Sequence, residues 1–223
     1  MYYQRNNRIG VTEIIIGINA VVFFIFYLFP NYNSIFSLNI GTSFDFMNMY
    51  GIQITYTINN GAFWQLLTSI FMHGGIMHIF FNMFALYIFG KPLEEKWGKA
   101  KFLSFYLTIG ILANIASVAF FILTKHPVSL IGASGAIYGV LLAFGGYYPE
   151  VILLLFFVIP IKAKWAVVLM AVLSLFFQVS NRMGNIAHIT HLFGFLFAYL
   201  YLLIFFRMDA IKEMFFRNRN YYY

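Results

Sequence analysis

The stretch SLIGASGAIYG, residues 129–139, places one serine among glycines and alanines in a chain that is otherwise strongly apolar. Small residues let membrane helices pack closely, and serine is one of the usual small residues at such contacts. The same small neighbours also leave the hydroxyl of Ser134 unshielded where we expect a helix to begin. The stretch is therefore compatible with a packing role for the serine or with a nucleophile.

The composition of the chain indicates a membrane protein. Of its 223 residues, 62% are hydrophobic and 9% are charged, whereas a soluble domain has about 25% charged residues. The chain has no cysteine, which excludes disulfides, zinc–thiolate sites and cysteine nucleophiles. The formal net charge is +7, but the basic residues stand in short clusters between apolar runs. That is the pattern of topology signals, so we expect a lipid bilayer and no nucleic acid as partner.

Six apolar stretches have about the length of 20 residues that a helix needs to cross a bilayer. They lie at 11–30, 70–90, 102–123, 131–148, 164–179 and 187–206. The apolar run 151–160 is short and ends in proline, so we expect it at the membrane interface or as a cap on the fourth helix. Because no internal repeat or linker separates these stretches, residues 1–223 are predicted to form one all-α, polytopic domain of six transmembrane helices.

The distribution of lysine and arginine predicts the orientation of these helices. Six spans place both termini on one side of the membrane, and only Lys125 and Arg182 lie on the other side. The remaining basic residues gather on the side of the termini, at positions 5, 8, 91, 96, 99, 101, 162, 164, 207, 212, 217 and 219. Loops rich in Lys and Arg stay in the cytoplasm. We therefore expect cytoplasmic termini, a multi-pass protein of the bacterial plasma membrane, and an apolar first loop, 31–61, in the outer leaflet.

Polar clusters stand at the outer start of the second, fourth and sixth spans. They are HGGIMHIFFN with His73, His78 and Asn82, GASG with Ser134, and NIAHITH with His188 and His191. Polar groups inside a membrane are costly and usually face an interior or a water-filled cavity, so their common depth predicts one shared site. His78 and Asn82 are four residues apart and share a helix face. His73 is expected to point away from that face, closer to water.

Small residues also predict that the fourth and sixth spans pack together. Gly135 with Gly139, and Gly194 with Ala198, each form a small-xxx-small face that lets two helix backbones approach closely. This contact brings the start of the sixth span, with its histidines, beside Ser134. Backbone N–H groups in a first helical turn lack internal partners and are available there to an oxygen anion.

Together these motifs resemble the rhomboid intramembrane serine proteases. The resemblance runs from about Trp64 to Ala198 and rests on GASGAIYG, on the H-x4-H-x3-N spacing of HGGIMHIFFN and on AHITHLFGFLFA. It implies transmembrane proteins as substrates, with Ser134 as nucleophile and a histidine of the last span as general base. The further site residues that it implies are His78, Asn82 and the Ser134 N–H for the oxyanion, Tyr138 beneath the base, and Gly132 in the lead-in to the serine.

Two other segments bear on the resemblance. PLEEKWG resembles the cytoplasmic E-x3-G feature of the family, with Glu94 four residues before Gly98. Many members have a Trp-Arg pair in the first loop, where this chain has Trp64 and Gln65. The departure concerns the anchoring of that loop and not the chemistry.

Two histidines compete for the role of the base. The family has small residues three and seven positions after the base, and His191 meets this pattern with Gly194 and Ala198. His188 would instead place Phe195 in the packed face, although an alanine precedes it, as one often precedes the family's base. We favour His191 and keep His188 as the alternative. In this interpretation His188 stands one turn nearer the outside and lines the entrance for water.

All seven acidic residues lie outside the spans or at their ends, so we expect a Ser–His dyad with no acid, no metal and no cofactor. One alternative is a membrane metalloenzyme that uses several of the histidines. It lacks an H-E-x-x-H motif and a carboxylate, and leaves GASG unexplained. Another is a transporter or an inactive rhomboid-like protein that binds membrane helices. The intact serine and histidine argue against inactivity, and few intramembrane charges argue against ion coupling. The sequence makes no prediction of oligomeric state.

Overall fold

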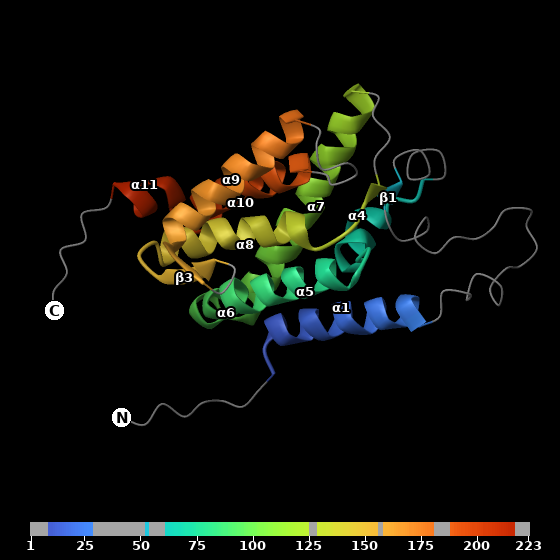
Figure 1. Cartoon of the computed structure of the whole chain (residues 1–223), viewed down its shortest axis with the longest axis horizontal. Helices are drawn as coiled ribbons and strands as arrows, with labels where there is room; N and C mark the ends of the chain where they lie inside the picture. The colour runs from blue at the N-terminus through green and yellow to red at the C-terminus, as the bar shows by residue number, and fades with distance from the viewer. Residues whose placement is uncertain are drawn as a thin grey trace, which may run out of the picture.

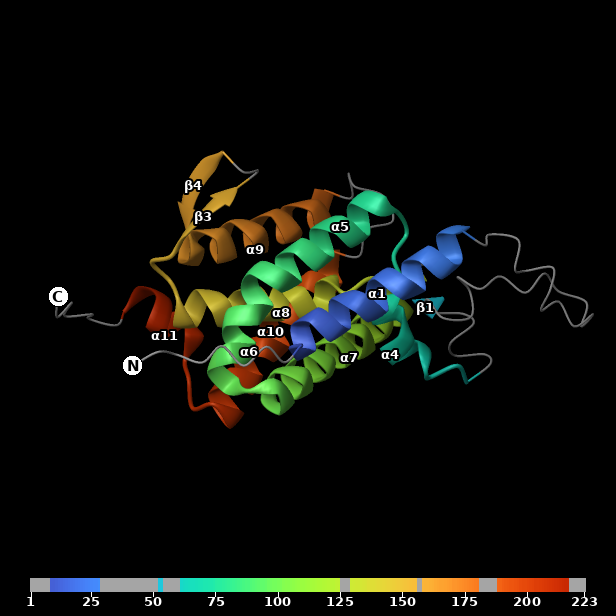
Figure 2. The ribbon, with the colours of Figure 1, turned by 90° about the horizontal axis from the view of Figure 1, so that it is seen from below.

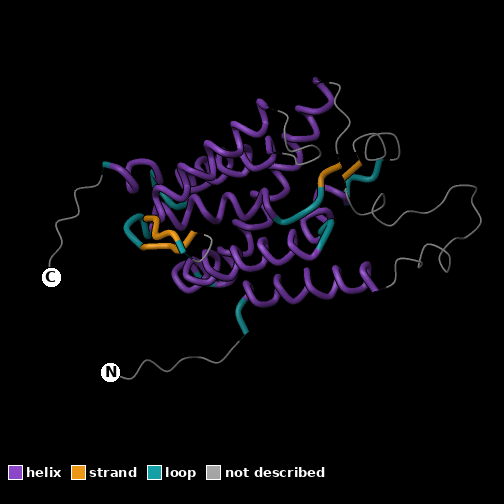
Figure 3. The backbone as a smooth tube through the Cα atoms, in the orientation of Figure 1, coloured by secondary structure: helices purple, strands orange, loops and turns teal. Residues whose placement is uncertain are grey.

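The computed structural model describes residues 9–28, 52–53, 61–124, 129–155, 158–180 and 188–216, which are mostly helical (Figures 1 and 3). The helices are α1 (Val11–Leu28), α4 (Gln65–Thr68), η2 (Ser69–Phe71), α5 (Ile76–Ala85), η3 (Leu86–Gly90), α6 (Lys91–Trp97), α7 (Lys99–Thr124), α8 (Ser134–Tyr147), α9 (Ala163–Ser180), α10 (His188–Phe205) and α11 (Ala210–Phe215). Two short antiparallel pairs, β1 (Ile52–Gln53) with β2 (Ser129–Leu130) and β3 (Ile152–Leu155) with β4 (Ile159–Lys162), are the strands of the described part.

Four of the described helical segments are long and apolar enough to cross a membrane, so the chain is an integral membrane protein. They are α7, α9, α10 and the continuous run of α5, η3 and α6 over Ile76–Trp97. Each of the six predicted stretches contains a helix, but the apolar segment Val11–Ile25 of α1 and the whole of α8 are shorter than the four long segments. The second stretch becomes a long helix only at Ile76, because the extended Gly75 precedes it.

The short helix α8 lies among the other helices (Figures 1 and 2) and contacts α5, α7, α9 and α10. Eleven of its 14 residues are buried. The rule of about 20 residues applies to a helix that must itself cover the hydrocarbon thickness. A helix surrounded by longer ones is freed from that requirement, which explains why the predicted stretch 131–148 exceeds the helix observed.

Helices α8 and α10 pack so closely at their small residues that their backbones come into contact. A Cβ added to Gly194 would lie 2.1 Å from the carbonyl oxygen of Gly135, and one added to Gly139 would lie 3.0 Å from the Cβ of Ala198. No side chain fits in either gap. This contact is the one predicted from the two small-residue faces, and it fixes the depth at which the start of α10 meets the start of α8.

Replacing Gly194 by alanine is therefore expected to force the two helices apart. Overpacking a core usually costs about 1–3 kcal/mol, and a clash with a backbone carbonyl has no flexible side chain to absorb it. We expect the thermal unfolding midpoint in detergent to fall by several degrees. Gly17→Ala in α1 is the matched control, because a Cβ there meets nothing within 4 Å. An unchanged midpoint for Gly194→Ala would contradict the close approach.

The described residues of the apolar run 151–160 lie in a β-hairpin and not in a cap on the fourth helix. The other expectation, a place at the membrane interface, concerns position and not secondary structure. Ile152 pairs with Lys162 and Leu155 with Ile159. The N–H of Ala163 donates to the carbonyl of Val151 at 2.8 Å and closes the base of the hairpin. Figure 2 shows that the hairpin projects sideways from the bundle, next to the start of α9.

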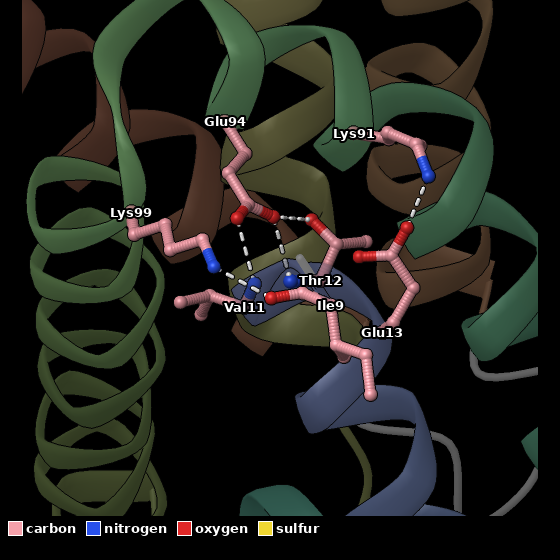
Figure 4. A network of polar contacts seen from close by, with 7 residues as sticks. All are labelled: Ile9, Val11, Thr12, Glu13, Lys91, Glu94 and Lys99. Carbon is pink, nitrogen blue, oxygen red and sulfur yellow. Dashed lines mark hydrogen bonds and ion pairs between the residues drawn. The ribbon is translucent and has the colours of Figure 1, made fainter. Parts of the chain in front are cut away.

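A buried carboxylate joins the first helix to α6 (Figure 4). Glu94 accepts hydrogen bonds from the N–H of Val11 at 2.6 Å, from the N–H of Thr12 at 2.8 Å and from the Thr12 hydroxyl at 2.7 Å. The first N–H groups of a helix have no partners within it, so the carboxylate caps α1 from a distant segment. Lys99 donates to the carbonyl of Ile9 at 2.6 Å, and Lys91 pairs with Glu13.

Several predictions concern residues outside the described part of the chain. They are those for Arg5, Arg8, Lys125, Arg182, Ala187, Arg217 and Arg219, and for nearly all of the first loop, 31–61. The described basic residues, by contrast, lie at or near one set of helix ends, in or next to α6, α7, α9 and α11, opposite the end at which α8 begins.

Candidate active site

Ser134 is the first residue of α8, and the local backbone explains why it stands at a helix start. The chain reaches it through β2, which pairs with β1. Gly132 then takes a φ of +112°, a conformation that side chains disfavour. The N–H of Gly132 donates to the carbonyl of Ser69 at 2.8 Å. This anchored turn directs the chain into α8, so that the first-turn N–H groups and the serine hydroxyl stand at the same end of the helix.

His191 is the residue that the structure places against the serine. Its Nε2 lies 2.8 Å from the Oγ of Ser134, within a hydrogen bond. The ring of Tyr138, one turn further along α8, stacks on the imidazole with centroids 4.1 Å apart and an interplanar angle of 13°. The close approach of α8 and α10 thus sets the distance between the two side chains, and the tyrosine ring sets the tilt of the imidazole.

The other ring nitrogen of His191, Nδ1, faces away from Ser134. The Nδ1 of His191 is buried and has no hydrogen-bond partner among the described residues. In a Ser-His-Asp triad a carboxylate at this position fixes the tautomer and the orientation of the ring. Here stacking on Tyr138 and the packing of two helices supply the orientation instead.

His78 and Asn82 lie on one face of α5, beside the turn that leads into Ser134. A Cβ at Gly132 would be 2.6 Å from the Nε2 of His78 and 3.6 Å from the Nδ2 of Asn82. The N–H of Gly74 donates to the Nδ1 of His78 at 3.4 Å, which assigns the ring proton to Nε2. The Nδ2 of Asn82 is buried and has no partner among the described residues. Two side-chain N–H donors therefore lie beside the residue two positions before the serine.

The other two described histidines differ from their expected places. His73 was expected closer to water, yet it is 6% exposed and its ring meets that of His78 edge to face at 4.9 Å. The expectation assumed that His73 continues the helix, whereas the chain from Met72 to Gly75 is not helical. His188 was expected to line the entrance for water, but it is 8% exposed and packs on Phe177 at 5.3 Å. Its ring lies 5.8 Å from that of His191.

The described residues contain no group of three or more His, Cys, Asp or Glu side chains that could together hold a metal ion. The four histidines in the described part of the chain form two pairs instead, one on each side of the start of α8.

Sequence reasoning missed a polar cluster that supports the site. The amide of Asn114 donates to the carbonyl of Leu66 at 2.9 Å and to the hydroxyl of Ser69 at 3.0 Å. Ser69 is the residue whose carbonyl holds Gly132. An asparagine in the middle of an apolar span was the available signal, because a polar group at that depth usually faces the interior of a bundle.

Two further contacts fix the start of α10. Ser117 of α7 donates to the hydroxyl of Thr190 at 2.7 Å, and the side chain of Gln178 in α9 accepts from the N–H of Ile189 at 2.8 Å. The second bond satisfies a first-turn N–H of α10 from a neighbouring helix. The turn that carries both His188 and His191 is thus held from two sides.

Comparison with known proteins identifies the family. The model of the rhomboid domain matches residues 60–208, more than half of the chain. The chain belongs to the rhomboid family. The matched region runs from just before α4 to just beyond α10, and so contains the serine, both histidine pairs and Asn82. Membership supports an intramembrane protease function.

Individual rhomboids resemble this chain at moderate identity. The rhomboid protease GluP of Bacillus subtilis (strain 168) is 32% identical over 195 residues, which are 87% of this chain and 35% of GluP. A second B. subtilis rhomboid, YdcA, is 32% identical over 146 residues, which are 64% of this chain and 69% of YdcA. The chloroplastic rhomboid-like protein 11 of Arabidopsis thaliana is 39% identical over 95 residues, 42% of this chain and 33% of that protein. The chain thus spans only about a third of the length of GluP and of the chloroplast protein.

Proposed function

We propose that this rhomboid is an intramembrane serine endopeptidase that cleaves transmembrane segments of other membrane proteins with a Ser134–His191 dyad. The observation that carries the proposal is the 2.8 Å contact between His191 Nε2 and Ser134 Oγ, with side-chain donors on the adjacent face. A serine hydroxyl is a weak nucleophile until a base takes its proton. The contact supplies that base at hydrogen-bond distance.

The reaction follows from these positions. As Oγ of Ser134 attacks the scissile carbonyl carbon, its proton passes to Nε2 of His191. The carbonyl oxygen becomes an oxyanion, and His191 then returns the proton to the departing amine. A water molecule attacks the resulting acyl-enzyme with His191 again as base, which releases the new carboxylate and restores the serine hydroxyl.

The oxyanion has three kinds of donor within reach of the start of α8. The first-turn N–H groups of α8 lack partners within the helix, and the ring N–H of His78 and the amide of Asn82 lie beside Gly132. Donors fixed in advance around a developing negative charge are often the largest single contribution to catalysis. The assignment also accounts for the buried amide nitrogen of Asn82 that has no partner among the described residues.

Depth and orientation define the substrate. We propose one domain of six transmembrane helices in the bacterial plasma membrane, with both termini in the cytoplasm as the basic residues predict. The start of α8 then lies toward the extracytoplasmic face, opposite the end that carries the basic residues. A complete helix hides its carbonyls in hydrogen bonds, so the substrate is a membrane segment that unwinds near that face.

Asn82→Ala is expected to lower kcat for cleavage by about 10²–10³-fold, the usual effect of removing one oxyanion donor. KM is expected to change little, because the donor acts on charge that forms only in the transition state. The measurement is the cleavage rate of a single-span substrate at several concentrations. Asn114→Ala is an informative comparison. Asn114 supports Ser69, so its replacement is expected to lower the stability of the protein as well as the cleavage rate. A normal kcat for Asn82→Ala would remove Asn82 from the oxyanion site.

The proposal as a whole is tested with the purified chain and a single-span model substrate. We expect cleavage that is unaffected by a metal chelator, and covalent labelling by a fluorophosphonate that peptide mass spectrometry locates at Ser134. Loss of cleavage on chelation would favour the metalloenzyme. Binding of the substrate with neither cleavage nor labelling would favour an inactive helix-binding rhomboid.

A further inference from the structure

The β3–β4 hairpin exposes apolar side chains on the face that points away from the protein. Ile152 is 64% exposed and Leu154 is 60% exposed on one strand, and Val158 at the turn is 76% exposed. Leu153, which points to the opposite face, packs against the core. An antiparallel pair with one face on a core normally shows polar residues on the other face. Apart from Lys162, which pairs with Ile152 at the base, both faces of this hairpin are apolar.

The backbone of the hairpin has the opposite requirement. Among the residues that the structure describes, the pair has two strands and no third neighbour, so the outer edge of each strand carries N–H and C=O groups outside the ladder. Such groups are strongly unfavourable in the hydrocarbon core of a bilayer, and Pro160 removes only one donor from them. The side chains therefore favour an apolar environment while the edges need hydrogen-bonding partners. The boundary between lipid headgroups and acyl chains satisfies both.

The base of the hairpin is charged and closed. Glu150 pairs with Lys162 at 2.7 Å and with Lys164. Hydrogen bonds from these two lysines, of which Lys162 has the larger effect, lower the pKa of Glu150 to about 2. The carboxylate therefore stays ionised. Two ammonium groups against one carboxylate leave a net positive charge beside the apolar face, which complements the phosphates of lipid headgroups.

The neighbouring helix indicates the level of the hairpin in the membrane. Trp165, in the first turn of α9, is 51% exposed, and exposed tryptophan is enriched at the membrane–water interface. Beyond it the exposed side of α9 continues as an apolar surface with Val172 at 57% exposure. Figure 2 shows the hairpin projecting across the direction of the helices rather than along it. It thus extends in the plane of the membrane, level with the interfacial end of α9.

We propose that the β3–β4 hairpin is an interfacial membrane anchor, inserted into the leaflet at the basic end of the bundle with Ile152, Leu154 and Val158 against acyl chains. Its occupant is lipid, not a soluble protein partner. The anchor holds the start of α9 through Glu150 and the backbone bond between Val151 and Ala163.

Single-cysteine labelling tests the proposal cleanly, because the chain has no cysteine of its own. Leu154→Cys and Val158→Cys are labelled separately with the environment-sensitive dye NBD and reconstituted into vesicles of phosphatidylcholine and phosphatidylglycerol. Val172→Cys on α9 is the hydrocarbon control, and Glu95→Cys at the exposed end of α6 is the aqueous control. The quenchers are aqueous iodide and lipids that carry a doxyl group near the headgroup or near the chain end.

We expect both hairpin labels to show blue-shifted emission, weak quenching by iodide, and stronger quenching by the shallow doxyl lipid than by the deep one. Val172 should be quenched most by the deep doxyl lipid. Hairpin labels that behave like the label at Glu95 would overturn the proposal and favour a soluble partner or a bare surface. Quenching mainly by the deep doxyl lipid would also overturn it, because the hairpin would then lie in the hydrocarbon core. Two independent label positions guard against one that disturbs folding.

Discussion

Ser134→Ala is expected to lower kcat for cleavage by at least about 10⁴-fold, because removing the nucleophile of a serine protease leaves only the contribution of binding and of the oxyanion donors. The hydroxyl contacts His191 at 2.8 Å and is the atom that must form the acyl-enzyme. Alanine is already the residue on one side of Ser134, so the variant should fold. The measurement is single-turnover cleavage of the model substrate, together with fluorophosphonate labelling.

Ser104→Ala supplies a matched control for this experiment. Ser104 is an exposed serine of α7 that lies 3.2 Å from the hydroxyl of Tyr201, and its loss should leave cleavage and labelling at native levels. Cleavage that survives in Ser134→Ala would rule out the serine mechanism. A fall in cleavage that comes with a lower unfolding midpoint would instead indicate that Ser134 acts through packing.

The positions of the helices and the grouping of the polar residues could be predicted because both depend on local sequence. Apolar runs of the required length mark helices in a membrane, and polar residues that interrupt them at a matching level mark a shared interior. The small-residue faces of Gly135 with Gly139 and of Gly194 with Ala198 predicted which two helices touch. The structure has the same contact, with a Cβ at Gly194 only 2.1 Å from the carbonyl of Gly135.

What could not be predicted depends on tertiary contacts or on ambiguous runs. The hairpin at 152–162 arises from a short apolar run, which periodicity alone cannot distinguish from a piece of helix. The burial of His73 depends on a non-helical lead-in to α5 that brings it against His78. The hydrogen bond from the N–H of Ile189 to the side chain of Gln178 joins two helices. Residue spacing within one helix cannot predict such a contact.

The assignment of the base shows why packing constrains better than a neighbouring residue. His188 and His191 are three residues apart at the start of one helix, and both belong to the polar cluster NIAHITH. The alanine before His188 is only a sequence neighbour and constrains no contact with another helix. The glycine three residues after His191 is needed where α10 packs against α8, so it indicates which histidine faces α8. Because Gly194 meets Gly135, the histidine one turn before it faces the start of α8. The structure has His191 there.

His191→Ala is therefore expected to lower kcat by at least about 10⁴-fold, because the serine loses the base that activates it. His188→Ala is the matched control. His188 is a buried histidine of the same helix turn, and its removal should leave kcat within about tenfold of the native value, since it makes no contact with the nucleophile. Cleavage, fluorophosphonate labelling and the unfolding midpoint are measured for both variants.

The double variant Ser134→Ala with His191→Ala separates a shared chemical step from two independent defects. Residues that act as one unit are strongly non-additive, so the double variant should be no slower than Ser134→Ala alone. For comparison, His188→Ala is combined with Ser134→Ala. If His188 has only a structural role, its small effect on kcat should add to that of Ser134→Ala. An inactive His188→Ala beside an active His191→Ala would reverse the assignment of the base. It would also require α10 to rotate about its axis so that His188 faced Ser134. Such a rotation conflicts with the packing of Gly194 against Gly135.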